Sequence, residues 1–488
     1  MKLLLIIPNI EGKIGSPPYN LALLKAFINQ STKHEAHVAD LSFHKTDWKA
    51  YLSGKIRDDR FDLIGISVLT FNLAQALQIA AFIKSISDIK IITGGVHAIL
   101  MPESLISNRN IDIVCIGEGE YPLKEIMDNG LDCTGIRGIW YKVKEDTVRN
   151  EPRRLLEDLD ELPFADWDDF RLEKYFLFNN NHITLMSTRG CPYECSYCNN
   201  HSLKNTLNGT YVRFRSVDSV LDEVGALIDK YHIHGLRYIY FIDDIFIMKR
   251  DWILEFCKKY VERGYARRIK WTASVRANLV KKDIIQAMKN AGCYQVGMGI
   301  EAANDYIRND VYNRNITREQ IESAVRIIKQ SGMLLSTQFI IGAPFETIEM
   351  MEESLKLAKK IDPDTVMFSI LMPLPKTNIR RLCENEGLIE DDNLANDQIM
   401  YSIPVIKSKH ADLGKIRRVY QKVRNYQIKK YITEGLRLRG FVFLKDLILF
   451  FSYYMPRYRL EIQNAFKFTV KRYVLENLER KTLGNAGC

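Results

Sequence analysis

The chain has 488 residues, 46% of them hydrophobic and 26% charged, a composition typical of globular proteins, and its length predicts about three domains. Its nine cysteines are mostly scattered singly, which excludes a disulfide framework and favours a reducing, cytoplasmic location. The net charge of +9 is uneven, since residues 401–488 carry 19 Lys and Arg against 6 Asp and Glu (+13), whereas the first 400 residues carry −4.

Residues 1–134 alternate short apolar runs with amphipathic segments, which predicts five strand–helix units. Units of this kind form a parallel, doubly wound, Rossmann-like sheet in an α/β fold. The first run is too short for the apolar region of a signal peptide, so we expect a buried strand there. The five runs are KLLLIIP, AHVAD, FDLIGIS, IKIIT and IDIVCIG.

Two strand ends of this sheet carry residues suited to ligand binding, because doubly wound sheets bind ligands at the carboxyl ends of their strands. GISVLT ends one strand and IITGGVH ends the next. The paired glycines of the second would let the backbone approach a large flat ligand closely. His97, after the glycines, fits a helix cap equally well.

Residues 135–180 interrupt the alternation and predict a linker. GIWYKVKEDTVRN has the pattern of a hairpin, and the acidic connector LLEDLDELPFADWDDF follows it.

Residues 181–385 predict a partial (β/α)6 barrel of the TIM type. Six further strand candidates alternate with helical segments, whereas a closed barrel has eight strands. Active sites of such barrels lie at the carboxyl ends of the strands, so the residues that follow each strand are candidate functional residues. The six candidates are ITLMST, LRYIYFI, IKWTAS, YQVGMGI, LLSTQFII and TVMFSIL.

Cys191, Cys195 and Cys198 follow the first barrel strand with the spacing Cys-x3-Cys-x2-Cys. Three thiolates on one short loop select zinc or an iron–sulfur cluster. Structural zinc sites use four ligands, and no second pair of cysteines occurs nearby. Three cysteines on a [4Fe–4S] cluster would leave one iron free for a substrate or cofactor, so the sequence favours this cluster.

The motif CPYECSYC resembles the signature of the radical S-adenosylmethionine (SAM) superfamily, whose open iron binds SAM and whose reduced cluster cleaves SAM to a 5′-deoxyadenosyl radical. The resemblance implies SAM-binding roles for residues at the other strand ends. Each of these also fits a structural role, such as a helix cap, an ion pair or a turn. The candidates are Tyr197 in the motif, Asp243 or Asp244 toward the amino group, Ser274 and Arg276 toward the carboxylate, Glu301 toward the ribose, and Ile341 and Pro344 beside the adenine.

The first sheet resembles cobalamin-binding domains, in which Ser-x-Leu is followed by Gly-Gly. The usual Asp-x-His-x-x-Gly element is absent, and no histidine precedes His34, so bound cobalamin would have no histidine as its lower ligand. The candidate cobalamin-binding residues are Ser67, Leu69, Thr70, Gly94, Gly95, His97, Gly117 and Glu118.

Residues 386–488 predict a basic helical region. Apolar or aromatic residues at 413, 416, 420 and 423 predict a helix with one buried face. The apolar stretch FVFLKDLILFFSYYM is too short to span a bilayer, and we interpret the region as a helical cap over the open barrel. A helix that docks on anionic lipid is the alternative; nucleic-acid binding is disfavoured because no recognisable module occurs.

The order of the two domains resembles the cobalamin-dependent radical SAM class. The resemblance implies a [4Fe–4S] cluster, SAM and cobalamin, an electron donor, and methylation of an unactivated carbon in a small-molecule or lipid-like substrate. We expect a cytoplasmic enzyme, with the C-terminal region in peripheral contact with the inner membrane surface as a further hypothesis. The alternatives are radical rearrangement, oxidation or cyclisation with the same cofactors, and a non-catalytic cobalamin-binding regulatory module. Methylthiolation of tRNA is disfavoured, since it needs three more cluster cysteines and the first domain has only Cys115 and Cys133.

Overall fold

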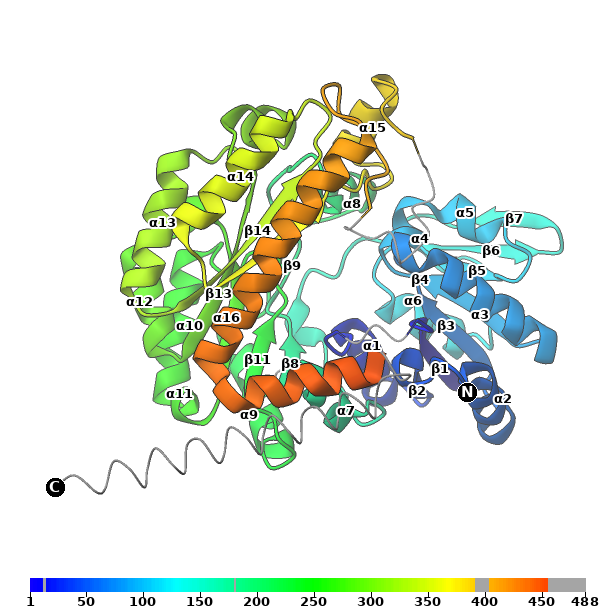
Figure 1. Ribbon diagram of the computed structural model, residues 1–488. Helices are drawn as coiled ribbons and strands as arrows, with labels where there is room; N and C mark the ends of the chain where they lie inside the picture. The colour runs from blue at the N-terminus through cyan, green and yellow to red at the C-terminus, as the bar shows by residue number, and fades with distance from the viewer. Residues whose placement is uncertain (12–14, 180, 391–402, 455–488) are drawn as a thin grey trace.

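The computed structural model describes residues 1–11, 15–179, 181–390 and 403–454. Two sheets lie side by side with helices packed around them, and a long C-terminal helix runs along the second (Figure 1). The predicted α/β fold, a doubly wound sheet followed by a partial barrel, is confirmed.

The first sheet has seven strands in the order β2-β1-β3-β4-β5-β6-β7. The first five strands of the chain are parallel, as predicted, whereas β6 and β7 form the expected hairpin and add to the edge in antiparallel orientation. The sheet therefore continues past the expected boundary at residue 134. Its strands are β1 (Lys2–Ile7), β2 (Glu35–Asp40), β3 (Leu63–Ser67), β4 (Lys90–Gly94), β5 (Ile113–Cys115), β6 (Ile139–Val143) and β7 (Asp146–Arg149).

Successive residues of β1 enter different apolar layers, which is why a continuous apolar run forms this strand. Leu3 and Leu5 belong to a core shared with the barrel, whereas Leu4 and Ile6 pack on the other face. The helices on the barrel side are α1 (Tyr19–Ser31) and α6 (Glu120–Asp128), and those linked with the other face are α2 (Trp48–Asp59), α3 (Leu73–Ile86), α4 (Val96–Leu100) and α5 (Pro102–Ile106).

The acidic connector is packed rather than loose. Lys25, which is 5% exposed, lies 3.2 Å from both Asp166 and Asp169, and Trp167 between them is buried in the shared core. The connector ends in α7 (Leu172–Phe178) and joins the two sheets firmly.

The second sheet has six parallel strands in the order β15-β14-β13-β12-β11-β8. A two-stranded antiparallel ribbon is formed by β9 (Thr188–Arg189) and β10 (Arg213–Phe214). Between these two strands the chain forms the cysteine loop and α8 (Asn199–Thr206). The six strands are β8 (His182–Leu185), β11 (Tyr238–Phe241), β12 (Lys270–Val275), β13 (Cys293–Glu301), β14 (Leu334–Ile341) and β15 (Thr365–Ile370).

Helices cover the outside of this partial barrel, and clear capping signals start several of them. Thr317 accepts from the Gln320 N–H, while the Gln320 side chain accepts from the Thr317 N–H, which forms a capping box. The helices are α9 (Val217–Tyr231), α10 (Arg250–Glu262), α11 (Tyr265–Arg268), α12 (Lys282–Asn290), α13 (Arg318–Gln330), α14 (Ile348–Ile361) and α15 (Asn378–Asn385).

The expected helical C-terminal region is confirmed: α16 (Leu413–Tyr454) lies along β15 and α14. Ile416 and Val423 are buried as predicted, and Val419 joins them. The Gln427 side chain accepts from the Phe368 N–H at 2.9 Å. The helix therefore supplies a hydrogen-bond partner to a backbone N–H of the edge strand β15. None of the described helices is long and apolar enough to cross a membrane, and the side chains of the apolar stretch at 441–455 lie outside the described part of the chain.

Candidate functional site

The three cysteines lie on the loop between β9 and α8, at the carboxyl end of the barrel. Cys191 and Cys195 are 8% and 6% exposed. Cys198 is the N-cap of α8, and its sulfur accepts from the backbone and side-chain N–H groups of Asn200 at 3.5 Å. The loop thus presents three unbonded thiols, of which that of Cys198 lies at a helix N-terminus, where negative charge is stabilised.

The donor set of this loop suits an iron–sulfur cluster. Three soft thiolates are typical iron–sulfur ligands, and three of them would leave one iron of a cubane without a protein ligand. Polar atoms without a partner also remain around the mouth of the barrel, namely Asn199 Oδ1, Arg276 Nε and Asn278 Oδ1.

The adjacent Asp243 and Asp244 after β11 have different surroundings. Asp243 accepts from the Ser187 N–H at 3.0 Å, the Ser187 hydroxyl at 2.8 Å and the Thr188 hydroxyl at 2.6 Å. Burial raises the pKa of Asp243 to about 6. Asp244 is exposed at the mouth and hydrogen-bonds Asn200. Asp244 is therefore the aspartate of this pair with room to meet a ligand.

Arg276 directly follows β12, the strand that contains Ser274. The Arg276 side chain points at the cysteine loop. One η nitrogen lies 3.7 Å from the Cys195 sulfur, the other donates to the Arg314 carbonyl, and the guanidinium stacks 3.7 Å from the Tyr193 ring centroid. Only Nε lacks a partner in the structure, so this nitrogen is the group left to meet a carboxylate.

Glu301 ends β13 in the left-handed backbone region, at φ 69°. Its carboxylate folds back over Gly299, where a Cβ would lie 2.3 Å from Oε1. Burial raises the pKa of Glu301, although Arg314 at 3.7 Å opposes the shift. Tyr197 accepts from Arg314 at 3.1 Å, so these three side chains form one buried polar group beside the cysteines.

Ile341 and Pro344, which the sequence placed beside the adenine, are held by backbone hydrogen bonds at the end of β14. The Ile341 carbonyl accepts from Leu371 at 2.9 Å, and the Pro344 carbonyl accepts from Lys409 at 2.7 Å. Glu346 holds the turn between them by accepting from the Gly342 N–H at 2.7 Å, and burial raises its pKa to about 8. The turn is therefore a rigid wall at the strand end.

The first sheet holds a cavity of about 670 Å³ at the carboxyl ends of its strands, within the usual range for ligand pockets. It extends between α1 and α6 and reaches barrel residues Thr184, Met186 and Ile242. Six of the predicted cobalamin-binding residues line it, namely Ser67, Leu69, Gly94, Gly95, Gly117 and Glu118.

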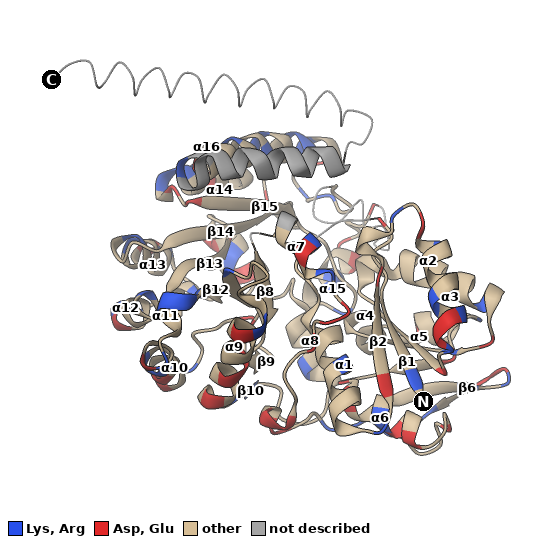
Figure 2. Cartoon of the chain, turned by 90° about the horizontal axis from the view of Figure 1, so that it is seen from below, with Lys and Arg blue, Asp and Glu red and all other residues tan. Residues whose placement is uncertain are grey.

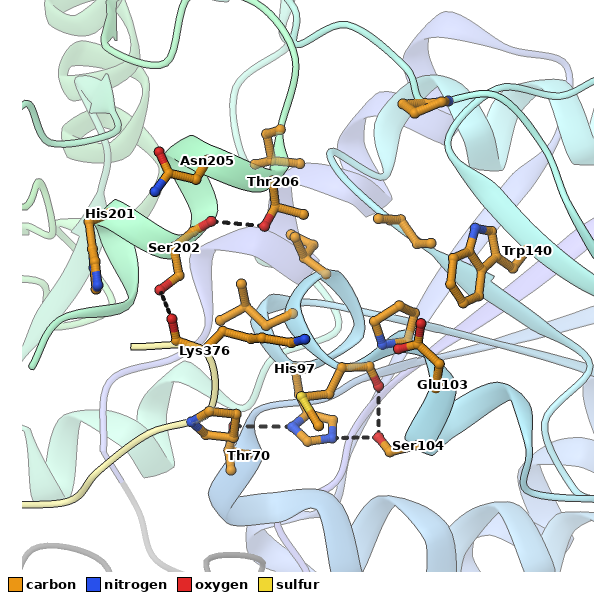
Figure 3. A pocket seen from close by; sticks show the side chains of 18 of the residues that line it. Thr70, His97, Glu103, Ser104, Trp140, His201, Ser202, Asn205, Thr206 and Lys376 are labelled. Atoms are coloured by element: carbon orange, nitrogen blue, oxygen red, sulfur yellow. Dashed lines mark hydrogen bonds between the residues drawn. The ribbon is translucent and has the colours of Figure 1, made fainter. Parts of the chain in front are cut away.

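Thr70 and His97 line a different cavity, of about 1010 Å³, between the first sheet and α8 (Figure 3). His97 Nδ1 lies 3.1 Å from the Thr70 hydroxyl, and Nε2 lies 2.9 Å from the Ser104 hydroxyl. Because the Ser104 proton goes to the Met101 carbonyl, Nε2 donates and Nδ1 accepts. Burial lowers the pKa of His97 to about 4. His97 is thus a neutral histidine whose two nitrogens are satisfied within its own domain.

Glu118 lines the 670 Å³ cavity, but its carboxylate forms salt bridges with two arginines. Its carboxylate pairs with Arg189 and Arg213 and accepts from the Leu156 N–H at 2.8 Å. Arg189 also pairs with Glu120. Arg189 and Arg213 belong to the β9–β10 ribbon, so these buried pairs connect the first sheet to the barrel beside the cysteine loop.

Several site residues have no clear signal in the sequence. Arg314, Asn200 and Tyr211 surround the cysteine loop, with the Tyr211 hydroxyl donating to Asn200 at 2.7 Å. His201 joins the same loop to α15, since its Nδ1 lies 3.2 Å from the Cys198 carbonyl and its Nε2 accepts from the Asn378 N–H. The position after a cysteine motif is the signal that could have indicated Asn200 and His201.

Comparison with known proteins gives matches for both halves of the chain. A model of the radical SAM superfamily matches residues 185–358, and a model of the B12 binding domain matches residues 12–127. An uncharacterized methyltransferase of Pyrococcus horikoshii is 31% identical over 92% of this chain and 95% of its own. The anaerobic magnesium-protoporphyrin IX monomethyl ester cyclase of Rubrivivax gelatinosus is 26% identical over 77% and 67%.

A solved structure shares the fold. The radical SAM methyltransferase TsrM from Kitasatospora setae superimposes with a TM-score of 0.67 and 22% identity, over 79% of this chain and 76% of its own.

Proposed function

The chain belongs to the radical SAM superfamily, in the class with a B12-binding domain ahead of the barrel, and we propose that it methylates an unactivated carbon of a small-molecule or lipid-like substrate. One observation carries this proposal: the cavity of the first sheet reaches the carboxyl end of the barrel at Met186 and Ile242. A corrin held there would face the SAM site, which places a methyl carrier beside a radical generator.

The residues around the cysteine loop divide into holding and positioning roles. Cys191, Cys195 and Cys198 would hold a [4Fe–4S] cluster, which supplies the electron that cleaves SAM. Asp244, whose exposed carboxylate is shared only with Asn200 among the contacts described above, would accept from the SAM amino group, and Arg276 Nε would donate to the SAM carboxylate.

The remaining predicted residues would shape the SAM pocket. Ser274, which lies in β12 two residues before Arg276, would contribute to the side of the SAM carboxylate. Tyr197 and Glu301 close the ribose side with their buried polar group, and the rigid Ile341–Pro344 turn would wall the adenine. In this proposal Asp243 fixes the Ser187–Thr188 segment and does not touch SAM, because the residue is 3% exposed and its carboxylate already accepts from three donors of that segment.

The cobalamin site is proposed for the residues that line the 670 Å³ cavity. The Gly94–Gly95 backbone would approach the corrin or its nucleotide, and Ser67 and Leu69 would flank it. Glu118 would contribute backbone only, because its carboxylate is used by two arginines. Thr70 and His97 would act indirectly by bracing the loops behind the cavity.

A second candidate reaction is cyclisation or another radical rearrangement with the same cofactors. It is favoured by the 26% identity to the cyclase of Rubrivivax gelatinosus. The cysteine loop and the cavity serve both reactions, so the products must distinguish them.

An electron donor and a membrane contact complete the proposal. We place the enzyme in the cytoplasm, with α16 able to rest on an anionic lipid surface. Lys and Arg residues recur along the coloured part of this helix (Figure 2). In its central turns the large apolar residues Ile428, Tyr431 and Ile432 are 45%, 52% and 38% exposed, beside Arg424 and Lys429. Exposed apolar and basic residues together are typical of interfacial helices.

The proposed reaction is tested by following a labelled methyl group. The anaerobically reconstituted protein is incubated with cobalamin, dithionite, methyl-deuterated SAM and a metabolite and lipid extract, with Cys195→Ala as the control. Carbon methylation predicts a deuterated product and equal amounts of S-adenosylhomocysteine and 5′-deoxyadenosine. A product without deuterium, formed with 5′-deoxyadenosine alone, would replace methylation by rearrangement or cyclisation.

A further inference from the structure

The cysteine loop is held in shape by a segment far along the chain, residues 311–315, which we call the bracing segment. The Ser196 N–H donates to the Tyr312 carbonyl at 3.0 Å. The Asn313 side chain donates to the Glu194 carbonyl at 2.9 Å. The backbone on both sides of Cys195 is therefore fixed by the bracing segment.

Arg314 stands at the centre of the bracing segment with its side chain turned inward. Asn313 and Asn315 on either side have φ values of 52° and 51°, which forms a tight turn. The Arg314 side chain is 9% exposed. Its Nη1 donates to the Cys195 sulfur at 3.7 Å and to the Tyr197 hydroxyl at 3.1 Å. The turn thus directs a buried positive charge at one ligand sulfur.

A second guanidinium reaches the same sulfur. Arg276 Nη1 also lies 3.7 Å from Cys195, and its other η nitrogen donates to the Arg314 carbonyl. The Cys198 sulfur, in contrast, accepts from the neutral amide groups of Asn200. The positive charge around the loop is therefore concentrated on Cys195, and Arg314 joins that charge to the shape of the loop.

We propose that Arg314, together with Arg276, is a positioning residue that raises the reduction potential of the cluster by donating to the Cys195 sulfur. This inference rests on the proposed function, because it requires the cluster. Reduction adds one electron to the cluster and makes the ligand sulfurs more negative. Cationic hydrogen-bond donors stabilise that state more than the oxidised one, and the buried setting strengthens the effect.

A competing explanation is that Arg314 only supports the shape of the cysteine loop and leaves the reduction potential unchanged. Asn313, the neighbouring residue of the bracing segment, offers a matched control variant that separates the two roles. Asn313→Ala removes the contact to Glu194 without changing any charge. Arg314→Gln removes the charge but keeps a polar side chain of moderate size. If Arg314 only supported the loop, the two variants would have the same effect on the cluster.

The test is a redox titration of the anaerobically reconstituted full chain without SAM, so that lost SAM contacts play no part. Dithionite supplies the electron, and visible absorption and electron paramagnetic resonance report the reduced fraction. At the wild-type midpoint we expect Arg314→Gln to show at least a tenfold lower ratio of reduced to oxidised cluster, equivalent to a shift of about 59 mV for one electron. Asn313→Ala should keep the wild-type midpoint.

A wild-type midpoint in Arg314→Gln with full iron and sulfide would overturn the inference. If Arg314→Gln loads no cluster, Arg276→Gln decides, because it removes the other guanidinium from the same sulfur; an unchanged midpoint there also overturns it. A wild-type protein that binds no cluster would instead contradict the proposed function. The two failures are therefore distinguishable.

Discussion

Gly94 and Gly95 are adjacent, yet a side chain at each should have a different consequence. A Cβ at Gly94 would lie 3.8 Å from the Cys115 Cβ, an ordinary contact, and would stand at the wall of the 670 Å³ cavity. A Cβ at Gly95 would lie 2.8 Å from the Val68 carbonyl, at φ 101°. Gly94→Leu should therefore fill the cavity without straining the fold, whereas Gly95→Ala should strain it.

The magnitudes follow from these contacts. Gly94→Leu should change the free energy of unfolding by less than about 1 kcal/mol, because its Cβ would make only an ordinary contact and the rest of the side chain has the cavity to enter. It should weaken cobalamin binding at least a hundredfold, about 2.7 kcal/mol. Gly95→Ala should lower the free energy of unfolding by about 1–3 kcal/mol, because a strained backbone and a backbone clash coincide.

Two measurements on the full-length variants separate these effects. Urea unfolding gives the stability, and equilibrium dialysis with hydroxocobalamin gives the affinity. The assignment of the cavity to cobalamin would be refuted by wild-type affinity in a folded Gly94→Leu protein. Loss of stability in Gly94→Leu alone would show that the space beside Cys115 is smaller than the structure indicates.

Three further outcomes follow from the site. Alanine at all three cluster cysteines should abolish iron, sulfide, visible absorption and SAM cleavage together; full iron and sulfide content would contradict the cluster. The wild-type protein should lose about 3 kcal/mol of its free energy of unfolding between pH 7 and pH 4, because the pKa of His97 is about 4 in the folded chain and the unfolded chain takes up the proton at higher pH. His97→Asn should remove this loss. Equal pH slopes of the two proteins in urea unfolding would count against the prediction. Arg189→Met should cost about 3 kcal/mol because it leaves the buried charge of Glu120 unpaired, while Glu118 keeps its pair with Arg213; a wild-type unfolding midpoint would disprove this.

The strand segments and their succession along the chain could be predicted because each strand is a short apolar run bounded by polar residues. The rule that chemistry lies at carboxyl strand ends then located the cysteine loop and the Gly94–Gly95 turn. The hairpin at β6 and β7 was also visible as an alternating pattern. Its pairing with β5 was not, because the edge on which a hairpin docks depends on tertiary contacts.

Side-chain direction is what the sequence could not supply. Asp243 and Asp244 are equivalent as letters, and only the fold turns the first toward Ser187 and the second toward the mouth. Arg314 lies in a polar stretch without periodicity, and its contact with Cys195 spans 119 residues. Contacts of this kind arise when loops from distant strands meet at one end of the barrel.

The contact between the two domains explains how one chain can align two cofactor sites. Arg189 is bound by Glu118 and Glu120 of the first domain and stands two residues before Cys191. The same ion pairs therefore dock the sheet and fix the start of the cysteine loop. Because these side chains are at most 17% exposed, salt screens them little. The spacing between the cavity and the cluster loop should consequently depend on these few buried charges rather than on the surface around them.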